Sequence, residues 1–238
     1  MRSRRSWASA LLLLSLVATS TAPAATSSPP AAEEFRYRWK LSRFLGVVAS
    51  LFMPGEGDGV LSFRPTTPGH LASELVITSE KSDSGEHFRY GAELELATGR
   101  TLRAWSSSFW RGEQRDKAGA IDGSGVIDIA SGIYLLRRDP PTQPRELEIW
   151  SDGKLYPVRV VPVAIEQRRV AGRVVPARHL RFEGIERPGK RFWKGSLELW
   201  LGLDAGATPV EIAINRRGAS VHLVLVSPAP NETQEALP

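Results

Sequence analysis

The sequence lacks cysteine altogether and contains only two methionines among its 238 residues. The absence of cysteine excludes disulfide bonds, thiol chemistry, cysteine-ligated metals and the cysteine-linked lipid anchor of bacterial lipoproteins. An exported domain of about 210 residues without disulfides must therefore be held together by a hydrophobic core, and this length is ample for one.

The short motifs of common catalytic sites are also absent. The sequence has no His-Glu-x-x-His, no Gly-x-Ser-x-Gly and no glycine-rich phosphate-binding loop. Asp128 and Asp204 are a candidate carboxylate pair, but a helix cap and a turn explain these two residues locally. We therefore expect a protein that is not an enzyme, with no catalytic residues and no cofactor.

The histidines do not predict a metal site. Their spacing lacks the pattern of metal ligands, and two of them, His179 and His222, lie in apolar strand patterns where a structural role is the commoner one. The remaining two are His70 and His87.

A basic N-terminal segment precedes an apolar run from Trp7 to Ala18, which is followed by the small-residue sequence Ala22-Pro23-Ala24. The apolar run is shorter than the roughly 20 residues that span a bilayer, so the pattern predicts a cleaved secretory signal peptide over residues 1–24. Because disulfides are absent, we expect the periplasm as the destination, with no transmembrane span in the mature chain.

Excess positive charge is small once the signal is removed. The whole chain has 31 lysines and arginines against 26 acidic residues, and three of these arginines precede residue 6. The mature chain then carries 31 − 3 = 28 basic residues against 26, which argues against a nucleic-acid partner.

Alternating apolar and polar residues dominate the remainder. Phe35 to Leu41 places aromatic residues on one face and cations on the other, as in a strand that covers a core on one side. Gly195 to Ser227 contains three such runs separated by turn residues, which predicts an antiparallel meander. Asp152-Gly153 and Ala171-Gly172 predict two hairpin turns, each between two strands.

One helix is predicted. Asp128 can cap it, the apolar residues Ile129, Ile133 and Leu136 follow helical spacing, and Pro140-Pro141 prevents its continuation. We expect this helix to close one end of the sheet. Ten to twelve strands without alternating helices predict an all-β fold: a single antiparallel sheet strongly curved into a barrel or half-barrel, with one short helix.

Three segments together resemble the DUF3108 proteins, exported bacterial proteins of unknown function. They are Asp128 to Arg137, then Gly172 to Leu180, and the C-terminal run from Leu199-Trp200-Leu201 through Pro209-Val210 to Gly218 and Ser220. The resemblance implies a periplasmic β domain over residues 35–227 and supplies no catalytic residues. Around it we expect a flexible lead, residues 25–34, and a disordered tail, residues 228–238.

Two segments allow alternative interpretations. Phe44 to Met53 is apolar but fits no single period, so a buried strand, a short helix and an exposed loop that meets a membrane or partner are all open. Lys154 to Lys194 contains eleven cations against three glutamates. This segment forms either ordinary solvated strand faces or a basic surface for anionic headgroups or another acidic envelope component.

Tryptophans spread over many strands belong to the core or line a cavity for an apolar ligand. The candidate contact residues for a ligand or surface are Trp39, Trp105, Trp110, Trp200, Arg168, Arg169, Arg173 and Arg178. The sequence thus favours a non-catalytic periplasmic protein that binds or presents a lipid-like envelope ligand, with peripheral membrane contact. The alternatives are an envelope interaction or scaffolding module that uses an exposed sheet edge and, third, a hydrolase.

Overall fold

The computed structural model describes residues 31–42, 55–80, 85–110, 112–216 and 219–227. The predicted signal peptide, most of the flexible lead, Phe44 to Met53 and the predicted disordered tail lie outside these residues. The lead is shorter than expected, because the first strand already begins at Glu33.

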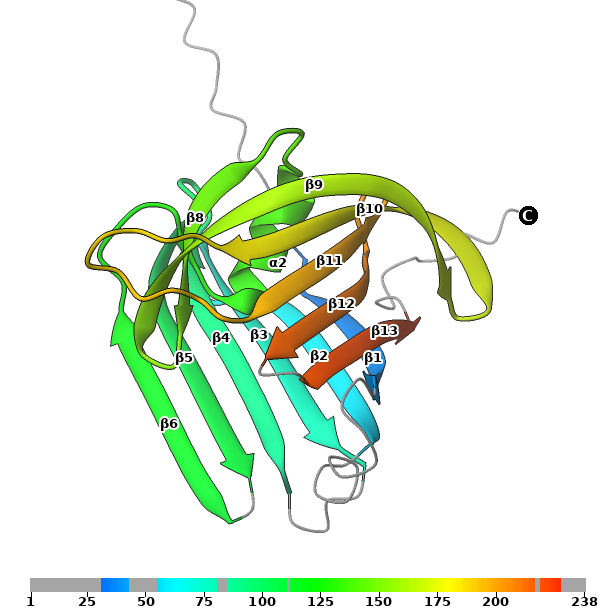
Figure 1. Cartoon of the computed structure of the whole chain (residues 1–238), viewed down its shortest axis with the longest axis horizontal. Helices are drawn as coiled ribbons and strands as arrows, with labels where there is room; N and C mark the ends of the chain where they lie inside the picture. The colour runs from blue at the N-terminus through cyan, green and yellow to red at the C-terminus, as the bar shows by residue number, and fades with distance from the viewer. Residues whose placement is uncertain (1–30, 43–54, 81–84, 111, 217–218, 228–238) are drawn as a thin grey trace, which may run out of the picture.

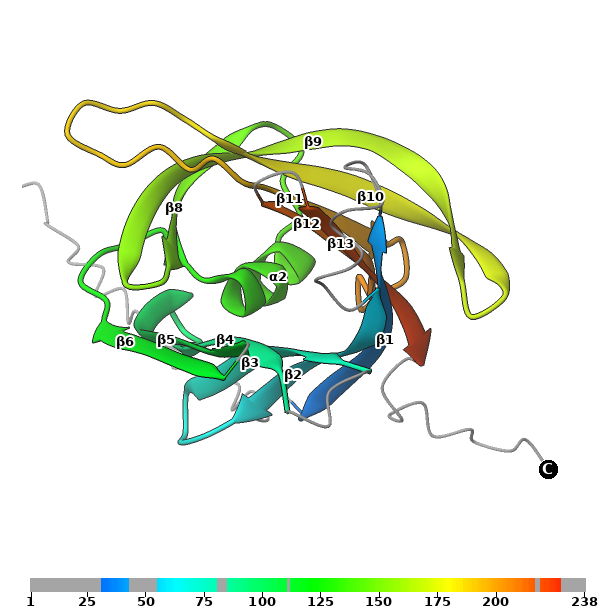
Figure 2. The same ribbon diagram turned by 60° about the horizontal axis from the view of Figure 1, so that its bottom comes forward.

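Thirteen strands form one sheet that bends around a short helix (Figures 1 and 2). Over the residues that the structure describes, the fold is therefore mostly β with one helix, as the alternation of apolar residues predicted. The strands are β1 (Glu33–Ser42), β2 (Glu56–Pro65), β3 (His70–Ser79), β4 (His87–Glu95), β5 (Arg100–Trp110), β6 (Glu113–Ala120), β7 (Val126–Ile127), β8 (Arg145–Ser151), β9 (Lys154–Val170), β10 (Arg173–Gly184), β11 (Ser196–Gly202), β12 (Pro209–Arg216) and β13 (Ala219–Ser227).

The sheet consists of two meanders joined where the first strand meets the last. Its order is β6-β5-β4-β3-β2-β1-β13-β12-β11-β10-β9-β8-β7, and β1 pairs with β13 antiparallel. The sheet is curved but not closed, since β6 and β7 are its two edges. One pairing departs from the predicted antiparallel pattern, because the two-residue strand β7 runs parallel to β8.

The helix, α2 (Ile129–Arg138), begins where the sequence predicts. The Asp128 carboxylate accepts hydrogen bonds from the backbone N–H groups of Ala130 and Ser131, and the Ser131 hydroxyl accepts from the Asp128 N–H. This reciprocal capping box satisfies amides that the first helical turn leaves unpaired. The helix packs against β2, β3 and β4 inside the curve of the sheet (Figure 2). Its apolar residues fill the interior, and Leu135 and Arg137 bring its last turn against the β4–β5 and β11–β12 turns at one end of the sheet, the end that the helix was predicted to close.

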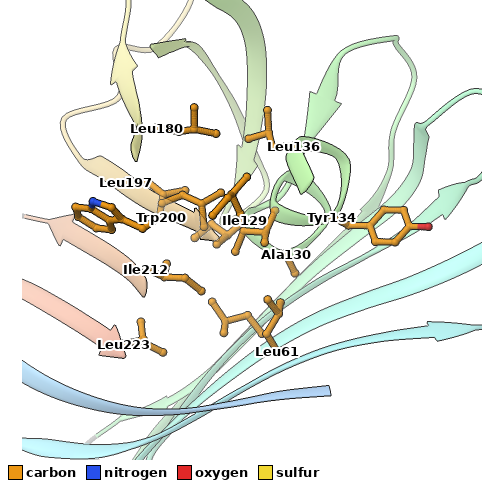
Figure 3. Packing of buried hydrophobic residues seen from close by; sticks show 14 of the residues in the cluster. Leu61, Ile129, Ala130, Tyr134, Leu136, Leu180, Leu197, Trp200, Ile212 and Leu223 are labelled. Carbon is orange, nitrogen blue, oxygen red and sulfur yellow. The ribbon is translucent and has the colours of Figure 1, made fainter. Parts of the chain in front are cut away.

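The core is continuous from the helix to both meanders. Ile133 and Leu136 of the helix share one buried cluster with Leu61 of β2, Ile212 of β12 and Leu223 of β13 (Figure 3). Fully burying a leucine or isoleucine side chain stabilises a fold by about 1.5–3 kcal/mol, so this cluster supplies the driving force that the missing disulfides would otherwise share.

Arg137 ties the end of the helix to both halves of the sheet. Its guanidinium donates to the carbonyl oxygens of Gly206 and Ala207 in the β11–β12 turn and forms a 2.8 Å ion pair with Glu33 of β1. It also lies 4.7 Å from the ring centroid of Phe35. A buried cation is costly unless it is paired, and these contacts compensate Arg137 fully.

Two strand boundaries were predicted wrongly. The segments Leu155 to Val163 and Ala164 to Val170 were expected as separate strands of two hairpins, but they form the single strand β9. The pairing register with β10 shifts between His179 and Leu180, opposite the predicted break. The chain therefore bulges there and stays extended. Both hairpin turns, at Asp152-Gly153 and Ala171-Gly172, occur as predicted, with positive φ at all four residues.

Candidate functional site

The β9–β10 hairpin extends past the rest of the sheet. Strand β10 pairs with β11 only from Ala177 onward, so the tip around Ala171 has only its own two strands (Figure 1). The tip turns back toward the sheet, because β9 contacts β13 although three strands separate them in the sheet order.

One arginine holds this curl. Arg168 of β9 forms a 2.9 Å ion pair with Glu211 of β12, and its guanidinium carbon lies 4.1 Å from the ring centroid of Trp200 on β11. Glu211 also contacts His222 of β13, with 3.2 Å between its carboxylate and the imidazole Nδ1. These side chains link four strands: β9, β12 and β13 through the hydrogen-bonded Glu211 carboxylate, and β9 with β11 through the cation–π contact of Arg168.

His179 occupies the centre of the same arrangement. Its two ring nitrogens lie 2.9 Å from a Glu166 oxygen and 2.7 Å from a Glu198 oxygen, and its ring stacks on Trp200 with 4.4 Å between centroids. The Trp200 indole donates a 3.0 Å hydrogen bond to the second oxygen of Glu166. We call Glu166, Arg168, His179, Glu198, Trp200, Glu211 and His222 the polar clamp.

One carboxylate of the polar clamp, Glu166, has a shifted pKa. The pKa of Glu166 is lowered, first by the hydrogen bond from the Trp200 indole and then by the bond to His179, against the opposing effect of burial. Glu166 is therefore ionised in the folded protein, and its two oxygens are both used as acceptors. Within the described residues, no group of three or more His, Asp or Glu side chains has the geometry of a metal site.

Beside the clamp, an apolar groove of about 710 Å³ separates the hairpin from the body of the sheet. Residues of the hairpin form one wall, and residues of β11, β12, β13 and the β11–β12 turn form the other. The lining residues are Val170, Ala171, Arg173, Val175, Pro176, Gly202, Leu203, Asp204, Thr208, Val210 and Leu225. Ligand pockets are usually apolar with a few polar groups, and this groove has that character.

Asp204 stabilises one wall of the groove. Its carboxylate accepts hydrogen bonds from the Gly206 N–H and from the N–H and hydroxyl of Thr208, which fixes the β11–β12 turn. Asp128 lies in the helix cap. Each candidate carboxylate thus serves its own local backbone.

The predicted basic segment is neutralised in part in the fold. Arg159 and Arg187 pair with Glu146, and Lys190 pairs with Glu148, so acids of β8 compensate cations of the loop and of β9. Among the described residues, no ion pair involves Arg169, Arg173 or Arg178. Arg169 and Arg173 are exposed near the hairpin tip, whereas Arg178 is half-buried on β10. Part of the unpaired positive charge of the segment is therefore on the hairpin.

The four candidate tryptophans do not line one common cavity. Trp39 belongs to the core, and its indole donates to the Thr78 carbonyl oxygen. Trp105 and Glu74 lie on the face of the sheet opposite the core, with 3.4 Å between the indole nitrogen and a carboxylate oxygen. Trp200 points away from the helix, toward the clamp (Figure 3).

Trp110 lies near the open edge of the sheet, in contact with Phe88. None of the four tryptophans lines the groove, which is formed by valines, a proline and leucines instead. Sequence reasoning missed these aliphatic residues because they follow the ordinary strand pattern. The one sequence signal near them was Ala171-Gly172, which marks the hairpin turn beside the groove.

Comparison with solved structures shows a similar fold. A β-barrel-like protein of the domain of unknown function DUF1849 from Brucella abortus is similar, with a TM-score of 0.55 and 10% sequence identity, over 83% of this chain and 97% of that chain. The hypothetical lipoprotein YmcC from Escherichia coli matches with a TM-score of 0.38 and 12% identity, over 82% and 87%.

No family model and no curated protein matches the sequence, so the resemblance to DUF3108 proteins stays a prediction. Within the described residues, no helix has the length and apolar character needed to cross a membrane.

Proposed function

We propose that this protein is exported to the periplasm and binds an apolar, lipid-like molecule of the cell envelope in the groove beneath the β9–β10 hairpin. The observation that carries the proposal is the groove itself. Its walls include Val170 and Val175 on the hairpin and Val210 and Leu225 on the sheet, and its volume of about 710 Å³ is that of a small-molecule site.

The polarity of the groove indicates how such a molecule is oriented. Arg173 lines the groove at the tip of the hairpin. An anionic headgroup beside this arginine would leave its acyl chain among the valines, where burial contributes about 0.8 kcal/mol per methylene. We propose binding rather than catalysis as the role, since Asp204, the carboxylate that lines the groove, is occupied by the hydrogen bonds of the β11–β12 turn.

Filling the groove tests the proposal. In Val175→Trp the indole occupies space that the ligand needs, whereas Val174→Trp adds the same side chain at a residue that is 58% exposed and does not line the groove. We expect native mass spectrometry of protein purified from its own host to detect a copurifying lipid with the wild type and Val174→Trp. Val175→Trp should lose at least nine-tenths of it.

Charge reversal tests the headgroup. Arg173→Glu should weaken the binding of an anionic fatty acid such as palmitate about tenfold, because it places a carboxylate beside the ligand's own charge. Arg103→Glu, at an exposed residue of β5 outside the groove, is the matched control and should bind as the wild type does. Protein that copurifies with no lipid and binds no palmitate would refute the proposal.

The scaffolding alternative receives less support. Strand β6 is an edge of the sheet, which a partner strand could extend. Its exposed residues, however, include Glu113, Arg115, Asp116 and Lys117. Charges of both signs on an edge strand are a common device against strand pairing.

A further inference from the structure

The inner face of the sheet changes character along β4, β5 and β6. Leu94 and Ala92 of β4 and Ala104 of β5 are buried, as expected on the face that carries the core. Farther along the same strands and on the same face, the residues become aromatic, hydroxyl-bearing or charged. A strand that served the core alone would end or stay apolar there.

Pairing places these residues in three rows across the strands. One row is Tyr90, Ser106 and Lys117, the next is Phe88, Ser108 and Arg115, and the third is Trp110 with Glu113. Because residues that face each other across an antiparallel ladder point to the same side, all of them project onto the concave face.

The opposite wall comes from the β8–β9 turn. Asp152 lies 3.5 Å from the Ser106 hydroxyl, and the Lys117 side chain passes over Gly153. The turn thus reaches across the open seam of the sheet toward β6 (Figure 2). Between these walls is a pocket of about 430 Å³. It shares no lining residue with the groove beneath the hairpin.

Two kinds of chemistry meet in this pocket. Phe88 and Trp110 lie with 5.7 Å between ring centroids at an interplanar angle of 33°, and they form an aromatic platform on the half-buried floor. The hydroxyls of Ser106 and Ser108 and the Asp152 carboxylate add short polar groups beside the rings. A flat ring with C–H groups on its face and hydroxyls on its rim matches such a surface, since the negative face of an aromatic ring attracts polarised C–H bonds.

The charged rim is net positive. The lining contains three cations, Arg115, Lys117 and Lys154, against two carboxylates, Glu113 and Asp152. Arg115 is paired with Glu113 at 2.7 Å. Neither Lys117 nor Lys154 forms an ion pair with a described residue, so two ammonium groups are available to an anion.

We propose that this pocket binds an acidic saccharide, with a sugar ring on Phe88 and Trp110, its hydroxyls on Ser106, Ser108 and Asp152, and its carboxylate or phosphate on Lys117 and Lys154. The aromatic floor favours a flat sugar ring, the serine hydroxyls and Asp152 favour a ligand with hydroxyl groups, and the lysines favour a negative charge.

Calorimetric titration of the mature protein with trigalacturonate tests the assignment, with neutral maltotriose and inorganic phosphate as comparison probes. We expect saturable binding of trigalacturonate, and binding of each comparison probe at least tenfold weaker. Equal affinity for maltotriose would overturn the acidic assignment, and equal affinity for phosphate would reduce the site to an ion contact without sugar recognition.

Variants localise the binding. Trp110→Ala removes half of the platform, and the double variant Lys117→Glu with Lys154→Glu reverses the rim charge; each should weaken trigalacturonate binding at least tenfold. Phe109→Ala, the neighbour of Trp110 on the opposite face of β5, is the matched control and should bind within twofold of the wild type. If Trp110→Ala fails to fold, Ser108→Trp fills the pocket from the same strand and should give the same loss. Unchanged binding in these variants would refute the site.

Discussion

At the scale of single residues, Asp128 is a buried polar side chain whose desolvation is compensated by hydrogen bonds. It is 1% exposed and its carboxylate accepts two backbone N–H bonds at the start of α2. Burial raises the pKa of Asp128, and hydrogen bonds from Ser131 and Ala130 oppose that rise. Desolvation is thus the largest influence on this carboxyl group.

We predict that Asp128→Ala lowers the free energy of unfolding by about 2 kcal/mol, because the cap is lost and two buried amides lose their acceptor. Asp128→Asn keeps an oxygen acceptor and should cost less at neutral pH. Chemical denaturation of both variants measures the difference. Equal stability of Asp128→Ala and the wild type would show that the capping box contributes nothing.

The raised pKa also predicts a pH dependence. An acid whose folded pKa exceeds its unfolded value binds more protons when folded, so its contribution to stability falls as pH rises from the unfolded pKa through the folded one. The stability of Asp128→Asn relative to the wild type should therefore increase with pH across that window. Denaturation series from pH 3 upward would contradict this if the two curves stayed parallel.

The pH dependence that Glu166 contributes to stability has the opposite sign. Its pKa is lowered, so its contribution is present above the unfolded pKa and is lost as pH falls through the folded value. Glu166→Gln should lower the free energy of unfolding by about 1–2 kcal/mol at neutral pH, where charged hydrogen bonds to Trp200 and His179 are lost. The loss should shrink in acid. Glu113→Gln, an exposed residue on β6, is the control and should change little at either pH.

At the scale of elements, the hairpin turn that carries the groove is not optimal. Ala171 has φ of 47°, a left-handed conformation that costs an alanine roughly 1 kcal/mol. Ala171→Asn should raise the free energy of unfolding by about 0.5–1 kcal/mol, since asparagine before glycine is favoured in a two-residue turn of this kind. Ala164→Asn, an exposed strand residue of the same hairpin, should not stabilise. Thermal melts compare the two variants.

Elements with a strong local signal were predictable from the sequence. The helix could be predicted because Asp128, its apolar spacing and Pro140-Pro141 agree on one interval. The turns could be predicted because the glycines of Asp152-Gly153 and Ala171-Gly172 readily adopt the left-handed backbone that a two-residue hairpin turn requires. The continuity of β9 was not predictable, since a bulge and a strand end look alike without the pairing partner. The two-residue strand β7 is too short to leave any periodic pattern.

The candidate sites depended on contacts that no sequence pattern carries. Arg168 and Glu211 are 2.9 Å apart, yet they lie on strands separated by β10 and β11. The uneven charge of the segment Lys154 to Lys194 likewise left two interpretations open, solvated strand faces or a basic surface, and the sequence could not show that glutamates of β8 and β12 pair with some of its cations in space. Pairing between distant strands decides such properties, and the sequence order conceals it.

At the scale of the whole molecule, the curved sheet separates two proposed sites. The groove is formed by the β9–β10 hairpin with strands β11 to β13, and the pocket by β4 to β6 with the β8–β9 turn. Between them lies a solid core that includes α2 and both meanders. Binding at one site couples to the other only if it shifts an equilibrium that both sites share.

We predict that the two sites bind independently. The dissociation constant for trigalacturonate should agree within twofold in the presence and absence of saturating palmitate, because a close-packed core and separate linings leave no shared contact. Each ligand should also raise the melting temperature of the protein, and the two increments should add when both are present. A change of more than fivefold in either dissociation constant would instead contradict independent binding. It would indicate that the curvature of the sheet changes as a whole, because the β8–β9 turn holds the sheet at its seam and the polar clamp holds it at the hairpin.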